Sequence, residues 1–160
     1  MIRLIVAVDK KNGMAKHGGQ PWYIPHDEKY FTEKTKSYGG KNVIGRITFQ
    51  TFKGPLAGRT NYVLTSNEED IEGAIQVHDL KTFLEQNKGE DLWIVGGAHV
   101  FQQVIDMGFA DELYITHVDA DFGFDQFFPE YSKTFTQTKV SDWHEENGFK
   151  FKYAIYSRAT

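Results

Sequence analysis

The stretch LWIVGGAHVF, residues 92–101, joins an apolar run at 92–95 to a predicted helix at 98–105 through Gly96 and Gly97. Runs that are almost wholly apolar are typical of strands buried on both faces, as in a parallel sheet covered by helices. A strand that turns through glycine into a helix leaves backbone N–H groups free at the positive end of the helix dipole. The stretch therefore predicts a strand–turn–helix unit that can hold an anion.

A second stretch, NVIGRITF at residues 42–49, repeats this order. An apolar strand at 42–44 meets Gly45 and then Arg46, before a short helix predicted at 48–52. Two such junctions suit a ligand with several phosphates, such as a dinucleotide, and Arg46 favours phosphate. At either junction alone, a glycine that merely makes a tight turn is the alternative. The G-x-G-x-x-G fingerprint and the P-loop pattern are both absent.

The rest of the chain alternates between strand-like and helix-like segments, which indicates an α/β fold. Near the end, alternating apolar residues flank Asn147-Gly148, a strong signal for a hairpin turn. We expect one domain over residues 1–160, with a mainly parallel central sheet flanked by helices and closed by a C-terminal antiparallel hairpin. Besides the segments above, the pattern predicts strands at 2–8, 60–66, 74–78 and 113–118, and helices at 25–37 and 79–87.

Composition narrows the possible functions. A chain of 160 residues favours one domain, and its net charge of -4 argues against general binding of nucleic acid or anionic membranes. The lack of cysteine excludes disulfides and thiolate metal sites, and the six histidines have no metal-ligand spacing, so we expect no metal. The first apolar run is too short for a signal core or a membrane span. We therefore expect a cytoplasmic protein, and a monomer because no dimer stripe is visible.

Asp27 lies in PWYIPHDEKYF, residues 21–31, just after a helix start at Pro25. Acids favour the first turn of a helix, and that preference alone could explain it. However, Tyr30 and Phe31 follow three and four residues later and so share its face. A carboxylate at the edge of an apolar face loses solvation, which raises its pKa. Asp27 could hold a flat, amidine-like heterocycle through two parallel hydrogen bonds, or pass a proton.

Arg59 follows a loop of glycine and proline in GPLAGRTN, residues 54–61. Its guanidinium fork can bind a carboxylate through two parallel hydrogen bonds. The alternative is a solvated surface arginine, which is the commoner case for any single arginine.

Taken together, these motifs resemble those of bacterial dihydrofolate reductases. The resemblance covers essentially the whole chain and keeps the order of LIVAVDKKNGM, PWYIPHDEKYF, VIGRITFQTF, PLAGRTN, VLTS, WIVGGAHVF, LYITHVDADF and DQFFPEY. It implies an NADPH-dependent oxidoreductase that reduces 7,8-dihydrofolate to tetrahydrofolate for one-carbon metabolism, in a family targeted by antifolates. Hydride would pass from nicotinamide C4 to pterin C6, with protonation at N5.

The resemblance also implies roles for residues on the substrate side. Asp27 would anchor the pterin and favour protonation at N5, with Thr116 hydrogen-bonded behind it and no second acid in the site. Trp22 would hold a water molecule near the pterin carbonyl. Arg59 would bind the glutamate α-carboxylate. The other substrate contacts would be the backbone carbonyls of Ala7 and Val95 and the side chains of Phe31, Phe52 and Leu56.

The cofactor would lie along the two glycine junctions, under a flexible lid formed by residues 13–20. Its implied contacts are Ala7, Ala15, Gln20, Gly45, Arg46, Ile47, Thr48, Leu64, Thr65, Ser66, Val95, Gly96, Gly97, Ala98, His99, Val100 and Phe101. Several residues depart from the common pattern of the family, and we expect them to affect the lid, cofactor affinity or antifolate sensitivity: Ala15, Gln20, Ile47, Ala57, and the run Phe124, Asp125 and Gln126.

Two other functions fit parts of the pattern. A pyrimidine reductase of riboflavin synthesis would share the fold and cofactor, but its ribosyl-phosphate substrate needs neither Asp27 nor Arg59. A nucleotide-binding module without catalysis would be expected to lack Asp27 or Trp22, and this chain has both.

Overall fold

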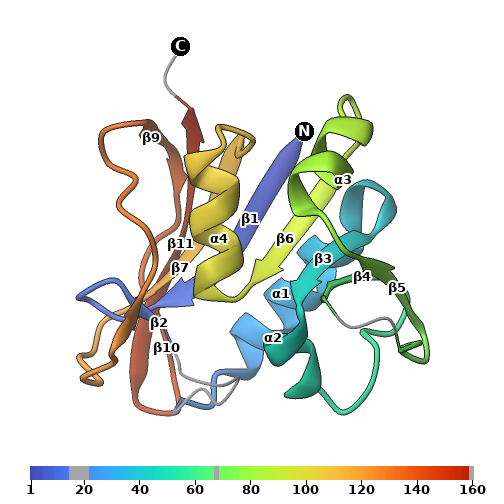
Figure 1. Ribbon diagram of the computed structural model, residues 1–160. Coiled ribbons are helices and arrows are strands. Elements are labelled where there is room, and N and C mark those ends of the chain that lie inside the picture. The colour runs from blue at the N-terminus through green and yellow to red at the C-terminus, as the bar shows by residue number, and fades with distance from the viewer. Residues whose placement is uncertain (15–21, 67–68, 159–160) are drawn as a thin grey trace.

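The computed structural model describes residues 1–14, 22–66 and 69–158. Within these ranges, nine strands form one twisted sheet (Figure 1). They are β1 (Ile2–Val8), β3 (Lys41–Gly45), β4 (Thr60–Leu64), β5 (Ala74–Val77), β6 (Leu92–Gly96), β7 (Glu112–Val118), β9 (Phe135–Val140), β10 (His144–Glu146) and β11 (Phe149–Arg158). The order across the sheet is β10-β11-β7-β1-β6-β3-β4-β5, and β9 pairs with β11.

The sheet is parallel from β7 to β5 and antiparallel at its C-terminal edge. β1 pairs in parallel with β6 and β7, whereas β11 pairs antiparallel with β7, β9 and β10. The turn between β10 and β11 has two residues, Asn147 and Gly148, with φ values of 52° and 82°. Two successive positive φ values are what a tight hairpin turn requires, and asparagine followed by glycine adopts them readily. The predicted fold class is confirmed.

Helices cover both faces of the sheet because neighbouring residues of a buried strand point in opposite directions. On one face Ile94 packs in a cluster with Val104 of α4 (Ala98–Asp106), and α3 (Leu80–Gln86) joins the same cluster. On the other face Trp93 packs with Phe31 of α1 (Pro25–Lys36). A short 3-10 turn, η1 (Ser37–Gly39), follows α1. Among the described residues, no helix is long and apolar enough to cross a membrane.

The short helix after β3 begins earlier than predicted. α2 spans Arg46–Gln50 and starts directly after Gly45, whereas the sequence pattern suggested 48–52. Thr51 and Phe52 still donate backbone hydrogen bonds to the preceding turn, at 3.1 Å each. The helical path therefore ends in a hydrogen-bonded turn over the residues that the pattern had assigned to the helix.

A two-stranded sheet formed by β2 (Gly13–Met14) and β8 (Gln126–Phe127) was not predicted. Asp9, which is buried directly after β1, contacts the segments that lead to this sheet. Asp9 Oδ1 accepts a hydrogen bond from Gly13 N at 2.8 Å, and Asp9 Oδ2 accepts one from Phe122 N at 3.1 Å. One side chain thus joins two loops that are distant in the sequence. Next to the paired strands, Phe128 N donates to the carbonyl of Asn12 at 3.0 Å.

Candidate active site

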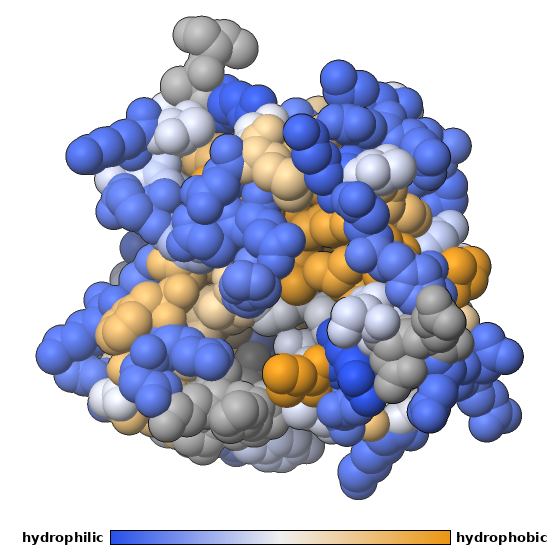
Figure 2. Space-filling model, viewed as in Figure 1, coloured by the Kyte–Doolittle hydropathy of each residue, from blue (hydrophilic) through white to orange (hydrophobic). Residues whose placement is uncertain are grey.

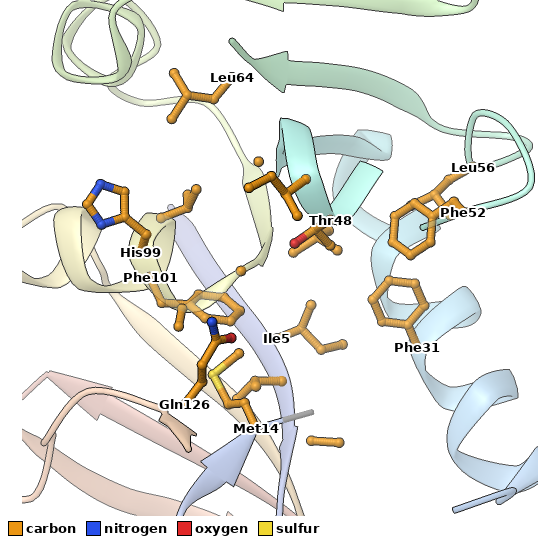
Figure 3. Close-up of a pocket in the computed structure, with 18 of the residues that line it drawn as sticks. Ile5, Met14, Phe31, Thr48, Phe52, Leu56, Leu64, His99, Phe101 and Gln126 are labelled. Atoms are coloured by element: carbon orange, nitrogen blue, oxygen red, sulfur yellow. The ribbon is translucent and has the colours of Figure 1, made fainter. Parts of the chain in front are cut away.

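A cleft of about 970 Å³ lies at the carboxyl ends of the parallel strands. Crevices at this edge of an open α/β sheet are the usual ligand sites of such folds. Figure 2 shows hydrophobic side chains gathered near the middle of this view, with hydrophilic side chains around them. In Figure 3, Phe31, Phe52 and Leu56 lie on one side of the cleft, and Leu64 and His99 lie on the other. The volume is at the upper end of the range for ligand pockets.

Asp27 lies in the first turn of α1 and lines the inner part of the cleft. Proline at the first helical position fits because its missing N–H would have no helical partner there. Asp27 is only 9% exposed, and Thr116 Oγ1 of β7 donates a hydrogen bond to Asp27 Oδ1 at 2.8 Å. Burial raises the pKa of Asp27 from 3.8 to about 6, although the Thr116 hydrogen bond and the nearby His26 both act to lower it. The carboxyl group can therefore exchange a proton near neutral pH.

The surroundings of Asp27 are mostly apolar. Phe31 on α1 and Ile5 on β1 belong to one buried cluster, and Phe52 and Leu56 line the cleft nearby. Trp22 is buried and packs against the ring of Phe122, with 5.2 Å between centroids. The inner part of the cleft is therefore an apolar space with the Asp27 carboxyl group at its end.

Arg59 lines the cleft from the loop before β4 and is half-buried. Its NH1 donates to Thr35 Oγ1 and its Nε to the carbonyl of Ala57, both at 3.0 Å. The side chain of Asn61 holds the loop by bonding both the N–H and the carbonyl of Leu56, at 2.9 and 3.1 Å. Within the described residues no acid pairs with Arg59. The guanidinium is thus held in place with its charge available for an anion.

The two glycine junctions adjoin each other in the cleft. α2 and α4 begin after Gly45 and Gly97, and neither N-cap supplies a side-chain hydrogen bond. A Cβ atom added at Gly97 would lie 3.0 Å from Thr48 Oγ1, and one at Gly45 would lie 3.3 Å from the carbonyl oxygen of Gly96. Only glycine permits such close packing, so the two helix N-termini face one common space. Their free N–H groups and dipoles favour negative charge there.

The outer part of the cleft is formed by the end of β4 and the start of α2. Leu64, Thr65 and Ser66 line it, and the carbonyl of Thr65 is 2.9 Å from His78 Nδ1. Ile47 is 64% exposed, which is unusual for so apolar a side chain. Here a ligand would meet both an apolar surface and polar groups.

Most of the predicted site residues meet in this one cleft. All eight predicted substrate residues line it, as does Trp22. Gly96 does not line the cleft. It has a φ of 128° and lies against the ring of Phe101. Ala15 and Gln20, together with most of the predicted lid, lie outside the described residues. The remaining predicted cofactor residues line the cleft: Ala7, Gly45, Arg46, Ile47, Thr48, Leu64, Thr65, Ser66, Val95, Gly97, Ala98, His99, Val100 and Phe101.

Sequence reasoning missed several residues of the cleft. Glu28 lines the cleft and is exposed, and it was not among the predicted site residues. The helix turns only about 100° per residue, which brings both Asp27 and Glu28 to the cleft. Gln126 enters it through the unpredicted β2–β8 sheet, and no local signal marks it. Alternation in β1 could have found Ile5, which shares a face with Ala7, and helical spacing in α1 could have found Tyr30; the others are Val6 and Thr32. Met14, which belongs to the predicted lid, also lines the cleft.

Metal ligands do not cluster in the part of the chain that the structure describes. No group of three histidine, aspartate or glutamate side chains there is placed to hold a metal ion. His117 in β7 has its Nε2 2.8 Å from the hydroxyl of Tyr156, so this histidine is a hydrogen-bonded strand residue.

The cleft joins a buried acid in an apolar wall to two adjoining helix N-termini, on a mainly parallel sheet. This combination is typical of α/β enzymes that bind a phosphate-bearing dinucleotide beside a second ligand. A family model described as dihydrofolate reductase matches residues 1–158, and the chain belongs to that family. The predicted family and enzyme class, an NADP-dependent oxidoreductase, are confirmed.

Individual relatives agree along nearly their whole length. The dihydrofolate reductase of Buchnera aphidicola is 33% identical over 165 residues, covering 98% of this chain and 99% of the relative. That of Drosophila melanogaster is 35% identical over 175 residues, covering 97% and 96%. A solved structure of the Enterococcus faecalis enzyme, complexed with NADP(H) and RAB-propyl, has a TM-score of 0.88 and 30% identity, covering 100% of this chain and 97% of that one.

Proposed function

We propose that this chain reduces 7,8-dihydrofolate to tetrahydrofolate with NADPH, in the cleft described above. The observation that carries the proposal is the placement of Asp27, buried and hydrogen-bonded by Thr116 at the inner end of that cleft. When bound, NADPH supplies the hydride, which adds to pterin C6 while a proton adds to N5. The product serves one-carbon metabolism.

On the substrate side, the residues of the cleft complement the parts of dihydrofolate. The Asp27 carboxylate accepts hydrogen bonds from the 2-amino group and ring N–H of the pterin. Phe31, Phe52 and Leu56 cover the benzoyl group. Arg59 binds the glutamate α-carboxylate through its guanidinium fork, since no acid of the described chain already occupies it.

On the cofactor side, the two adjoining helix N-termini fit the phosphates. A Cβ atom at Gly45 would press on Val100 and one at Gly97 on Thr48, and both helices leave N–H groups without capping side chains. We assign the phosphate contacts to Gly45, Arg46, Ile47, Thr48, Gly97, Ala98, His99 and Val100, the adenosine side to Leu64, Thr65 and Ser66, and the nicotinamide side to Ala7, Val95 and Phe101.

The simplest test mixes purified protein with NADPH and dihydrofolate and follows the loss of reduced-cofactor absorbance. We expect turnover that depends on both reagents. A folded protein with no turnover would overturn the proposal. The riboflavin pyrimidine reductase alternative is tested in the same assay by replacing dihydrofolate with a ribosylaminopyrimidine phosphate, for which we expect no reaction.

The rate of hydride transfer is expected to fall as the pH rises from 6 to 9. The reaction needs a complex that carries the proton destined for N5. As the pH rises this proton is lost, which leaves an ionised Asp27 carboxylate beside neutral dihydrofolate. Because burial raises the pKa of Asp27 to about 6, the fall begins near neutral pH and not near pH 4. Above the midpoint the rate should fall about ten-fold per pH unit. Single-turnover stopped-flow measurements check this, and a rate independent of pH over this range would contradict it.

We further propose that residues 1–160 form a single domain that acts as a monomer in the cytoplasm. The length favours one domain, and the N-terminal apolar run is β1 of the central sheet. Light scattering on the purified chain measures the oligomeric state, and a mass of twice 18.4 kDa would contradict a monomer.

A further inference from the structure

The C-terminal hairpin contacts the segment that begins α1. Asn147 Nδ2 in the turn donates to the carbonyl of Tyr23 at 2.9 Å. Glu146 Oε1 on β10 accepts from the backbone N–H of His26 at 2.8 Å. On β11, the hydroxyl of Tyr153 is 2.7 Å from His26 Nδ1. The hairpin thus makes three polar contacts with residues just before Asp27.

These contacts matter because α1 lacks a capping side chain of its own. Its N-cap is Ile24, whose backbone carbonyl accepts from the N–H groups of Asp27 and Glu28 but whose side chain has no acceptor for the N–H group of His26. Glu146 supplies that acceptor from another part of the chain. The first turn of α1, which carries Asp27, is therefore held by the hairpin.

Tyr153 connects this contact to the acid. It lies directly opposite Thr116 in the pairing of β11 with β7, so the two side chains project from the same face. Thr116 donates to Asp27, and the ring of Tyr153 stacks on that of Tyr30, with 3.9 Å between centroids and 22° between planes. Tyr153 therefore lies between His26 and the residues that surround Asp27.

We propose that His26 and Tyr153 are positioning residues, whose mutual hydrogen bond fixes the first turn of α1 and so keeps the Asp27 carboxyl group against Thr116. This inference rests on the proposed function, because it assigns Asp27 its role in the reduction. The two residues act through Asp27 and need not touch either ligand.

Several titratable groups form or surround this contact and bear on any pH measurement. α1 contributes His26, Glu28 and Tyr30, β7 contributes Tyr114, β11 contributes Tyr153, and β10 contributes His144 and Glu146. The ring of His144 stacks on that of His26, with 5.1 Å between centroids. Positive charge on His26 lowers the pKa of Asp27, whereas Glu28 raises it. The decisive variant should therefore leave every one of these charges unchanged.

Tyr153→Phe meets that condition, since it removes one hydroxyl group and keeps the ring. Tyr156→Phe is a matched control on the same strand: its hydroxyl also bonds a histidine, His117 Nε2, at 2.8 Å. We expect Tyr153→Phe to lower the hydride-transfer rate about five-fold on the low-pH plateau, where the rate does not depend on the midpoint, and this is the size expected for one lost hydrogen bond. We also expect its pH midpoint to rise, because a displaced Asp27 loses the Thr116 contact that lowers its pKa. Tyr156→Phe should change neither.

Two further measurements distinguish positioning of Asp27 from a general loss of packing. His26→Ala combined with Tyr153→Phe should reduce the rate no more than the stronger single variant, since both remove the same bond. Titration of the Asp27 carboxyl carbon by NMR follows its proton in the absence of turnover, so it tests positioning even if the chain does not reduce dihydrofolate. A midpoint of Asp27 that is unchanged in Tyr153→Phe, or that moves equally in Tyr156→Phe, would overturn the inference.

Discussion

Replacing Asp27 with asparagine is expected to lower dihydrofolate turnover at neutral pH by about 10²–10⁴-fold, the usual contribution of one acid–base group. Asparagine keeps the size of the side chain and an oxygen that can accept from Thr116, but it cannot carry the proton that N5 needs. Activity should recover partly in acid, where protonated dihydrofolate forms in solution. Steady-state assays from pH 5 to 8 check both parts, and turnover like that of the unmodified protein would show that Asp27 is not the anchor.

The Asp27→Asn variant should also be more stable than the unmodified protein at neutral pH. Measuring this stability controls for damage to the fold. The pKa of Asp27 is raised from 3.8 to about 6, so its stabilising contribution is full below about pH 4 and is lost as the pH rises through 6. At pH 7 the buried carboxylate is ionised at a cost that asparagine avoids. We expect the free energy of unfolding to rise by about 1–3 kcal/mol at pH 7, with no gain below pH 4. Urea unfolding at both pH values measures this, and a loss of stability at pH 7 would contradict the desolvation of Asp27.

Replacing Arg59 with glutamine is expected to raise KM for dihydrofolate about 100-fold and to change kcat little. The variant loses a paired, charge-assisted contact with the substrate carboxylate, where each hydrogen bond to a charged group contributes about 1.5–3 kcal/mol. This contact lies far from the reacting atoms, so binding should suffer more than chemistry. The KM of the Arg59→Lys variant should lie between those of the unmodified protein and the Arg59→Gln variant, because lysine keeps the charge but not the planar fork.

A truncated substrate gives the decisive control for Arg59. A dihydropterin without the benzoyl-glutamate tail has no carboxylate to bind, so its kcat/KM should be similar in the Arg59→Gln variant and the unmodified protein. Equal losses on both substrates would mean that Arg59 supports the loop at residues 56–59, through Thr35 and the backbone, and does not bind the tail.

Local rules predicted much of the fold from the sequence. The glycine junctions at residues 42–49 and 92–101 became strand–turn–helix units, because apolar runs and glycine turns depend mainly on nearby residues. The hairpin at Asn147-Gly148 formed for the same reason. Helix spacing placed Asp27 beside Phe31 in one cleft, although its depth of burial came from strands and loops elsewhere in the chain.

The sequence by itself therefore determined the α/β class, the two helix N-termini that face the cleft, and the acid and the arginine that we assign to dihydrofolate. Only the tertiary structure brought Gly97 against Thr48, paired β2 with β8, and joined His26 to Tyr153. Each of these contacts links residues far apart in the chain. Their formation depends on how whole strands pair and pack. Periodicity and turn chemistry depend on a few neighbouring residues at a time and therefore do not predict such contacts.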